Sequence, residues 1–345
     1  MGDDMDSDFT SPTPSNSSGS SLDVSWGNTP ITNIQYGRLI GTGGFGSVYL
    51  AKLDNVGLPV AVKRLHSHMK NVAAKTESFK AESRLLNFSH PNIVCVLATA
   101  AGTPVEDPLI VMEYAGTHNL QQLINKAERP FDVLVRMSYA LDISQALAYL
   151  HRNCLIHLDV KPANVIVNET TNRCKLADFG CSQETMKKTG SANQNIRSHL
   201  TGTYVYRAPE LLRGQPASTK ADIYALGITM WQMLSLEVPY SGLPQQPVIF
   251  AVVRSHLRPT LSVKLQKDCT DIPVEKCYIE LYKQCWHHDV RVRPSADDLV
   301  EVLSFWKRDI ITYKAYDSIF DPEQPKNYEN GSYRRHSSLE VQNFV

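Results

Sequence analysis

The folded part of the chain begins with short strand-like runs of apolar, aromatic and β-branched residues. Three of them occupy residues 34–40, 47–52 and 60–63, and a fourth, Leu109–Val111, follows later. Runs of this length and composition are typical of β-strands. The pattern therefore predicts a small β-sheet in the first part of the fold.

From residue 133 onward the pattern changes, because core-type residues recur every three or four positions, the period of an α-helix. One series is Met137, Ala140, Leu141, Ser144, Leu147 and Leu150, and another is Ile223, Leu226, Met230, Trp231 and Leu234. The second series is apolar enough for a central, buried helix. A β-rich first part and an α-rich second part predict an α+β fold of two lobes with a cleft between them.

The two ends of the chain differ in composition from its middle. Residues 1–33 are largely Ser, Thr, Asp, Asn, Gly and Pro, with few apolar residues whose burial could offset the entropy lost on ordering. We expect an acidic, disordered tail there, a folded domain over 34–308, and a polar extension over 309–345.

Charge and composition exclude several classes of protein. The 345 residues include 35 Lys or Arg and 35 Asp or Glu, with no sustained basic stripe, so we expect no nucleic-acid partner. No apolar run approaches the ~20 residues that a membrane span requires, so we expect no membrane partner. The acidic N-terminus differs from a secretory signal, which predicts a cytosolic or nuclear protein, and of the two we expect a cytoplasmic one. Nothing in the sequence indicates an oligomer, so we expect a monomer.

A glycine-rich segment, Gly41-x-Gly43-x-x-Gly46, lies between the first two predicted strands. The same spacing occurs in dinucleotide-binding folds, but there a helix follows directly, whereas residues 47–50 favour a β-strand. The glycines therefore predict the tip of a β-hairpin. Such a hairpin can lie close over a polyphosphate and present backbone N–H groups to it, with Val48 covering a flat base.

Lys63 ends the apolar run Val60–Lys63 and is expected to point inward. A buried lysine needs a partner, and the next predicted helix offers Glu82, which lies three residues after Phe79 and four before Leu86. A carboxylate on such an apolar face is costly unless it is paired, which favours a Lys63–Glu82 ion pair. Glu77 is the alternative partner.

Three motifs follow in a fixed order: the His157–Asn164 segment, HLDVKPAN, then Asp178-Phe179-Gly180, then Ala208-Pro209-Glu210. Together with the glycine hairpin and the strand that ends at Lys63, they match the signature set of protein kinases. Residues 36–306 thus resemble the eukaryotic protein kinase fold. The resemblance implies a small antiparallel N-lobe with one helix over 34–113 and a larger, mainly α-helical C-lobe over 116–308.

The resemblance implies a role for each motif residue in transferring phosphate from ATP with Mg²⁺. Asp159 would be the catalytic base, and Asn164 and Asp178 would hold Mg²⁺. Lys63 would contact the α- and β-phosphates, and Lys161 the γ-phosphate.

Residues 112–115 resemble the segment that joins the two lobes of a kinase, where backbone groups pair with adenine and Met112 limits the rear pocket. The implied nucleotide site comprises Ile40, Gly41, Gly43, Gly46, Val48, Ala61, Lys63, Glu82, Met112, Glu113, Ala115 and Ile166. Two further roles are structural: Glu210 would pair with Arg293, and Asp222 would accept backbone N–H bonds from the catalytic loop.

Lys161 and Gly202-Thr203 stand where serine/threonine kinases have the same residues, so in these positions the chain resembles that group. The amino-acid sequences of the motifs, together with Trp231-Gln232-Met233, are similar to those of the Mos family. That family implies a kinase that phosphorylates and activates a MAP kinase kinase in oocyte meiosis and contributes to metaphase arrest. One alternative is a Raf-like or other MAP kinase kinase kinase outside the germ line. Another is a pseudokinase scaffold, whose mark would be loss of Lys63, Asp159, Asn164 or Asp178, and all four are present.

Leu158 departs from the wider kinase pattern, which has Arg at this position to bind a phosphorylated residue of the activation loop. Because leucine has no charge for a phosphate to organise, we expect activity without loop phosphorylation. The candidate phosphosites concerned are Thr189, Ser191, Ser198 and Thr201.

Overall fold

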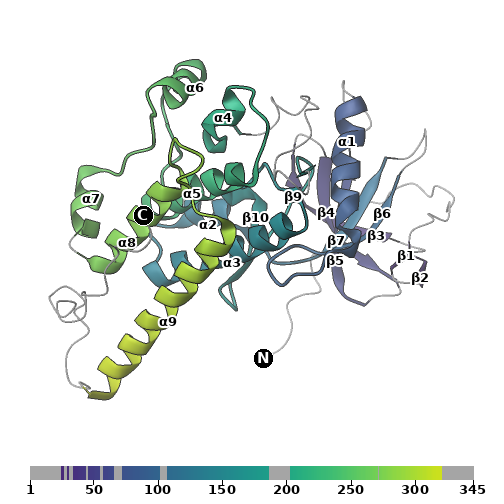
Figure 1. The fold of residues 1–345 in the computed structure, drawn as a ribbon. Helices are drawn as coiled ribbons and strands as arrows, with labels where there is room; N and C mark the ends of the chain where they lie inside the picture. The colour runs from purple at the N-terminus through teal and green to yellow at the C-terminus, as the bar shows by residue number, and fades with distance from the viewer. Residues whose placement is uncertain are drawn as a thin grey trace.

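The structure is a computed structural model, and it describes residues 25–26, 29–30, 34–43, 46–54, 57–65, 72–101, 107–185, 203–270 and 272–320. Within these residues the chain forms a β-sheet with one helix beside it, followed by a larger and mainly helical part (Figure 1). The expected two-lobed α+β architecture is confirmed. Thr189, Ser191, Ser198, Thr201 and Gly202 lie outside the described residues.

The N-terminal lobe contains a five-stranded antiparallel sheet. Its strands, in spatial order, are β3 (Ile34–Thr42), β4 (Gly46–Leu53), β5 (Pro59–Leu65), β7 (Leu109–Glu113) and β6 (Val96–Ala100). The central strand β5 is buried on both faces. Val60 and Val62 pack into a small core with Leu53 and Val111, so the alternation of a strand directs Ala61 and Lys63 to the opposite face.

The helix of this lobe, α1 (Val72–Ser83), contacts β6 and β7 and continues as a 3₁₀ turn over Arg84–Asn87. The tighter turn changes the helical phase, so Leu85 is fully buried whereas Leu86 is 39% exposed. The expected inward position of Leu86 is therefore wrong. Glu82, which precedes the change, is buried as expected.

Helices build most of the C-terminal lobe: α2 (Leu120–Lys126), α3 (Val133–Arg152), α4 (Pro209–Leu212), α5 (Thr219–Ser235), α6 (Gln245–Arg254), α7 (Val263–Thr270), α8 (Pro273–Cys285) and α9 (Ala296–Phe320). Helix α5 is buried along nearly its whole length, as its sequence predicts, and contacts both α3 and α8. Helix α3 packs in turn against α9 (Figure 1). None of the helices in the described residues is both long and apolar enough to cross a bilayer.

Short strands of the C-terminal lobe hold the loops that carry the motifs. Strand β10 (Val165–Asn168) pairs with β11 (Arg173–Leu176) and β8 (His118–Asn119), and β9 (Leu155–Ile156) pairs with β12 (Gln183–Glu184). Residues 157–164 therefore form a loop that is fixed at both ends, by β9 and by β10.

Near the two ends of the chain, the structure describes β1 (Ser25–Trp26) paired with β2 (Thr29–Pro30), and helix α9, which runs on past residue 308 to Phe320. The rest of the 1–33 segment and residues 321–345 lie outside the described residues.

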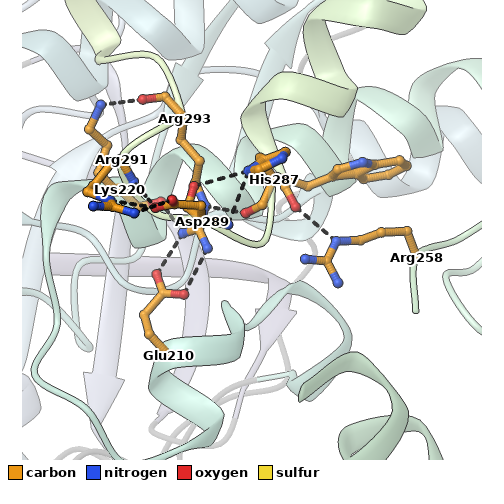
Figure 2. A network of polar contacts seen from close by, with 8 residues as sticks. Glu210, Lys220, Arg258, His287, Asp289, Arg291 and Arg293 are labelled. Carbon is orange, nitrogen blue, oxygen red and sulfur yellow. Dashed lines mark hydrogen bonds and ion pairs between the residues drawn. The ribbon is translucent and has the colours of Figure 1, made fainter. Parts of the chain in front are cut away.

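The predicted pairing of Glu210 with Arg293 is present and buried (Figure 2). The two guanidinium nitrogens donate to the carboxylate at 2.6 and 2.8 Å. The same guanidinium donates to the carbonyl oxygens of His287 and Lys220 at 2.8 and 3.0 Å. Arg293 thus joins α4, α5 and the loop before α9 through a single buried side chain.

Candidate active site

Lys63 contacts two carboxylates that come from opposite lobes. Its Nζ donates to Glu82 of α1 at 2.5 Å and to Asp178 at 2.7 Å. The predicted Lys63–Glu82 pair is therefore confirmed, whereas the alternative partner Glu77 is exposed and lies near Lys80. One lysine thus connects the sheet, the helix and the Asp178-Phe179-Gly180 motif.

Burial alone would lower the pKa of Lys63, but the charges of Asp178 and Glu82 outweigh it and raise that pKa above its ordinary value. Burial would raise the pKa of Asp178, but Lys63 lowers it, so this carboxylate stays ionised. Burial raises the pKa of Glu82 to about 7, against the opposing effect of Lys63. Asp178 is therefore the carboxylate of this site that is ionised near neutral pH and can offer negative charge to a further cation.

The described glycines lie at the hairpin end of β3 and β4, as predicted: Gly41 is opposite Val48, and the N–H of Gly43 donates to the carbonyl oxygen of Gly46 at 2.9 Å. A Cβ on Gly46 would approach the carbonyl oxygen of Arg64 to 2.3 Å, so packing of the chain requires this glycine. A Cβ on Gly43 would meet nothing within 4 Å. No described part of the chain therefore fills the space beside Gly43, as the predicted approach of a phosphate chain requires.

Four of the predicted nucleotide-site residues lie on one face of the sheet. Val48 is directly opposite Lys63 in the ladder of β4 and β5, and Met112 is opposite Ala61 in the ladder of β5 and β7. Directly opposite residues share a face, and Ala61 and Lys63 share theirs by strand alternation. Ile40 lies at the irregularity in β3 just before Gly41, while Ile166 is placed on β10 of the other lobe.

The three residues predicted to be catalytic, Asp159, Lys161 and Asn164, lie together in the loop between β9 and β10. Lys161 donates to Asp159 Oδ2 at 2.7 Å, and the amide of Asn164 donates to the same oxygen at 2.8 Å. The Asn164 carbonyl oxygen then accepts the backbone N–H of Ala177 at 2.9 Å, which fixes this loop against the segment that carries Asp178. Among the described residues, donors occupy only Oδ2 of Asp159, so Oδ1 is the oxygen that could accept from a substrate hydroxyl.

Two residues of the site have left-handed backbone angles, Leu158 with φ of 64° and Asp178 with φ of 62°. Such angles cost about 1–3 kcal/mol each and persist only where surrounding contacts impose them. For Leu158 the contact is Asp222, which is fully buried and accepts the N–H groups of His157 and Leu158 at 2.9 and 2.8 Å. The predicted role of Asp222 is confirmed.

Asn164 and Asp178 each keep one oxygen that could bind a divalent cation. The bonds above use the Nδ2 of Asn164 and the Oδ1 of Asp178, and no donor from the described part of the chain occupies their remaining side-chain oxygens. The Asp178 side chain is 39% exposed, so a ligand can reach it. Amide and carboxylate oxygens are the ligands that Mg²⁺ prefers, so the two residues fit such an ion.

Sequence reasoning missed a contact across the segment that joins the lobes. Lys175 of β11 donates to both carboxylate oxygens of Glu113, at 2.6 and 2.8 Å, and Glu113 also accepts the N–H of Cys95 at 2.8 Å. Lys175 is directly opposite Ile166 in its own sheet. The pair therefore holds the end of β7 at a fixed position over the strand that carries Ile166.

We expect the Lys175→Met variant to raise the KM for ATP about threefold to tenfold and to change kcat less than twofold. A partly buried, charge-assisted pair of this kind is worth about 1 kcal/mol, and its loss loosens the segment that would hold adenine without disturbing Asp159. Steady-state kinetics at varied ATP concentration would measure both constants. Lys80→Met, which removes an exposed lysine of α1, is the matched control, and equal effects of the two variants would contradict the role of Lys175.

Gly180 shows a second feature that the sequence could not reveal. A Cβ at this position would lie 2.4 Å from Ser78 Oγ and 3.0 Å from Glu82 Oε1. Only glycine lets α1 approach closely enough for Glu82 to reach Lys63. The neighbouring Phe179 is buried edge-on against the ring of His157, with 4.8 Å between centroids.

The chain is similar to known proteins along most of its length. The family model "Protein kinase domain" matches residues 34–304. The serine/threonine-protein kinase mos of Patiria pectinifera is 46% identical over 266 residues, which cover 77% of this chain and 73% of that protein. The proto-oncogene serine/threonine-protein kinase mos of Mus musculus is 37% identical over 301 residues, covering 84% and 85%. The mos kinase of Xenopus laevis is 39% identical over 273 residues, covering 76% and 73%.

Proposed function

The chain belongs to the protein kinase family and, within it, to the Mos serine/threonine kinases, and from this premise we propose that it phosphorylates and activates a MAP kinase kinase during oocyte meiotic maturation. It is a serine/threonine protein kinase, as expected. The observation that supports the proposed substrate is the 46% identity to a mos kinase over 266 residues. The proposal also includes that the kinase acts in the cytoplasm, that it is a monomer, and that it contributes to metaphase arrest.

In the proposed mechanism, the protein accelerates the reaction mainly by aligning ATP with the substrate hydroxyl and by neutralising phosphate charge, because phosphoryl transfer needs little covalent catalysis from the protein. Lys63, held between Glu82 and Asp178, offers its charge to the α- and β-phosphates of ATP. Asp159 accepts the proton of the substrate hydroxyl at its Oδ1, and Lys161 offers its charge to the γ-phosphate. Mg²⁺, held by Asn164 and Asp178, would neutralise charge on the phosphates.

Two rival functions predict different outcomes. A pseudokinase scaffold would not need Lys63 bonded to Asp178, or Asn164 bonded both to Asp159 and to the backbone N–H of Ala177, yet all of these bonds are present. A Raf-like kinase acting outside the germ line would have the same site. Expression confined to oocytes favours the Mos-like function, and broad expression favours the Raf-like one.

The test of the proposed substrate is an assay of the full chain with MgATP and a catalytically inactive MAP kinase kinase. We expect phosphate on the activation-loop serines of that protein, located by mass spectrometry. A generic Ser/Thr peptide serves as the second substrate. If the peptide is phosphorylated and the MAP kinase kinase is not, the chain is a kinase with another substrate and the proposal is wrong.

The structure adds a physical reason for the expected independence from loop phosphorylation. The Leu158 side chain packs with Leu211 against Ile156 and Ala217, so the position contributes an apolar contact rather than a charge. We expect phosphatase treatment, or Ala at the four candidate phosphosites, to change kcat/KM less than twofold. A kinase assay before and after treatment with phosphatase measures this, and loss of activity would contradict it.

A further inference from the structure

A groove of about 480 Å³ lies in the C-terminal lobe, between α8 and the segment that follows α6. Helices α7 and α8 lie at the end of this lobe farthest from the N-terminal sheet (Figure 1). None of the catalytic or nucleotide-site residues lines the groove. It is therefore a separate feature of the surface, and its volume falls in the range of common ligand sites.

The floor of the groove is apolar and rigid. It is formed by Ile279, Tyr282 and Trp286 from α8 and its end, and by Pro259 and Leu261 from the facing segment. Ile279, Tyr282 and Trp286 are at most 7% exposed, and the rings of Tyr282 and Trp286 pack edge-on with 4.8 Å between centroids. Because the floor is already packed into the fold, a ligand meets a preformed surface.

The rim of the groove is basic. Its lining includes Arg258, Lys276 and Lys283 but only one carboxylate, Glu280. Lys283 lies 3.0 Å from Glu280, and both side chains are about half exposed. Lys276 is exposed on the same helix. The groove thus presents an excess of positive charge around an apolar floor, although the whole chain has a formal net charge of zero.

Arg258 and the groove wall are held in place by backbone contacts. Its guanidinium donates to the carbonyl oxygens of Trp286 and Leu257 at 2.9 and 2.8 Å and lies over the ring of Tyr224. The adjoining carbonyl of His287 accepts from Arg293 (Figure 2). The wall is therefore part of the buried Arg293–Glu210 network rather than a mobile flap.

Three histidines complete one end of the groove. The rings of His256 and His288 stack with 4.2 Å between centroids and 13° between planes, and His287 lies 4.3 Å from His288. Desolvation and the two neighbouring rings lower the pKa of His288. These rings thus add flat surface and ring nitrogens at this end of the groove.

We propose that this groove is a docking site for a peptide segment of a partner protein, in which an apolar side chain is flanked by Asp or Glu. The apolar residue would occupy the floor over Tyr282 and Trp286, and the acidic residues would face Lys276, Lys283 and Arg258. Complementary charge at a rim chiefly gives specificity and fast association, and the buried apolar contact supplies affinity.

The test is selection of a random peptide library, displayed on phage, against the full chain and against its Lys276→Glu/Lys283→Glu double variant. We expect peptides selected on the native chain to contain Leu, Phe or Tyr flanked by Asp or Glu, and to bind the double variant at least about tenfold more weakly in fluorescence anisotropy. Arg308→Glu, an exposed charge reversal on α9, is the matched control and should leave peptide affinity unchanged.

Phosphorylation of a short serine peptide by the double variant should remain within twofold of the native rate, which shows that the variant is folded and that the groove is separate from the catalytic site. Selected peptides without an acidic and apolar pattern would overturn the proposal. So would selected peptides that bind the double variant as tightly as the native chain, or a library that yields no binder.

Discussion

The Asp159→Asn variant is expected to have a kcat about 10²- to 10⁴-fold below that of the native chain, which is the usual contribution of a positioned general base. Asparagine keeps the shape of the side chain and can still accept from Lys161 and Asn164, so the loop should keep its conformation. It cannot, however, take the proton of the substrate hydroxyl. Steady-state phosphorylation of a serine peptide measures the loss.

Asp309→Asn, an exposed carboxylate on α9, is the matched control for this variant and should leave kcat unchanged. Thermal unfolding of both variants should agree with that of the native chain to within the error of the measurement. An Asp159→Asn chain with more than a tenth of native kcat would mean that another group accepts the proton.

The Arg293→Ala variant is expected to lose about 3–5 kcal/mol of unfolding free energy, because it leaves the buried Glu210 carboxylate without its partner. Two backbone carbonyls, those of His287 and Lys220, would lose a donor as well. Urea unfolding followed by circular dichroism measures the change.

Arg291→Ala is the control for Arg293, since Arg291 lies two residues away but its side chain is 90% exposed and pairs with Asp289 at the surface. Its unfolding midpoint should not change measurably. If the two variants are equally stable, the buried network does not hold the helical lobe together as described.

Motif order and the cost of burying charge predict two contacts that the structure confirms, the Lys63–Glu82 pair and the backbone bonds to Asp222. A carboxylate beside apolar residues needs a cation, so the sequence predicts that Glu82 pairs with Lys63, the lysine of the neighbouring apolar strand. The same helical reasoning placed Leu86 inward, which is wrong, because the 3₁₀ turn at Arg84–Asn87 changes the phase by which residues face the core. Sequence periodicity does not show where a helix tightens.

Features that depend on distant segments could not be predicted from one sequence. Lys175 and Glu113 are 62 residues apart in the sequence. From the sequence alone each is indistinguishable from an ordinary surface charge, because their contact depends on how β7 and β11 are arranged in space. In the sequence, Gly180 is identified only as part of a motif. The position of α1 in the structure shows that a side chain at residue 180 would clash with Ser78. The basic groove is formed between α8 and the segment that follows α6, and no sequence motif marks that segment.

The most direct test of this account is transfer of the γ-phosphate from radiolabelled ATP to a protein substrate by the full chain, followed by identification of the phosphorylated amino acid after acid hydrolysis. We expect label on serine or threonine, and loss of that label in the Lys63→Met variant. Label on tyrosine, or undiminished transfer by that variant, would contradict it.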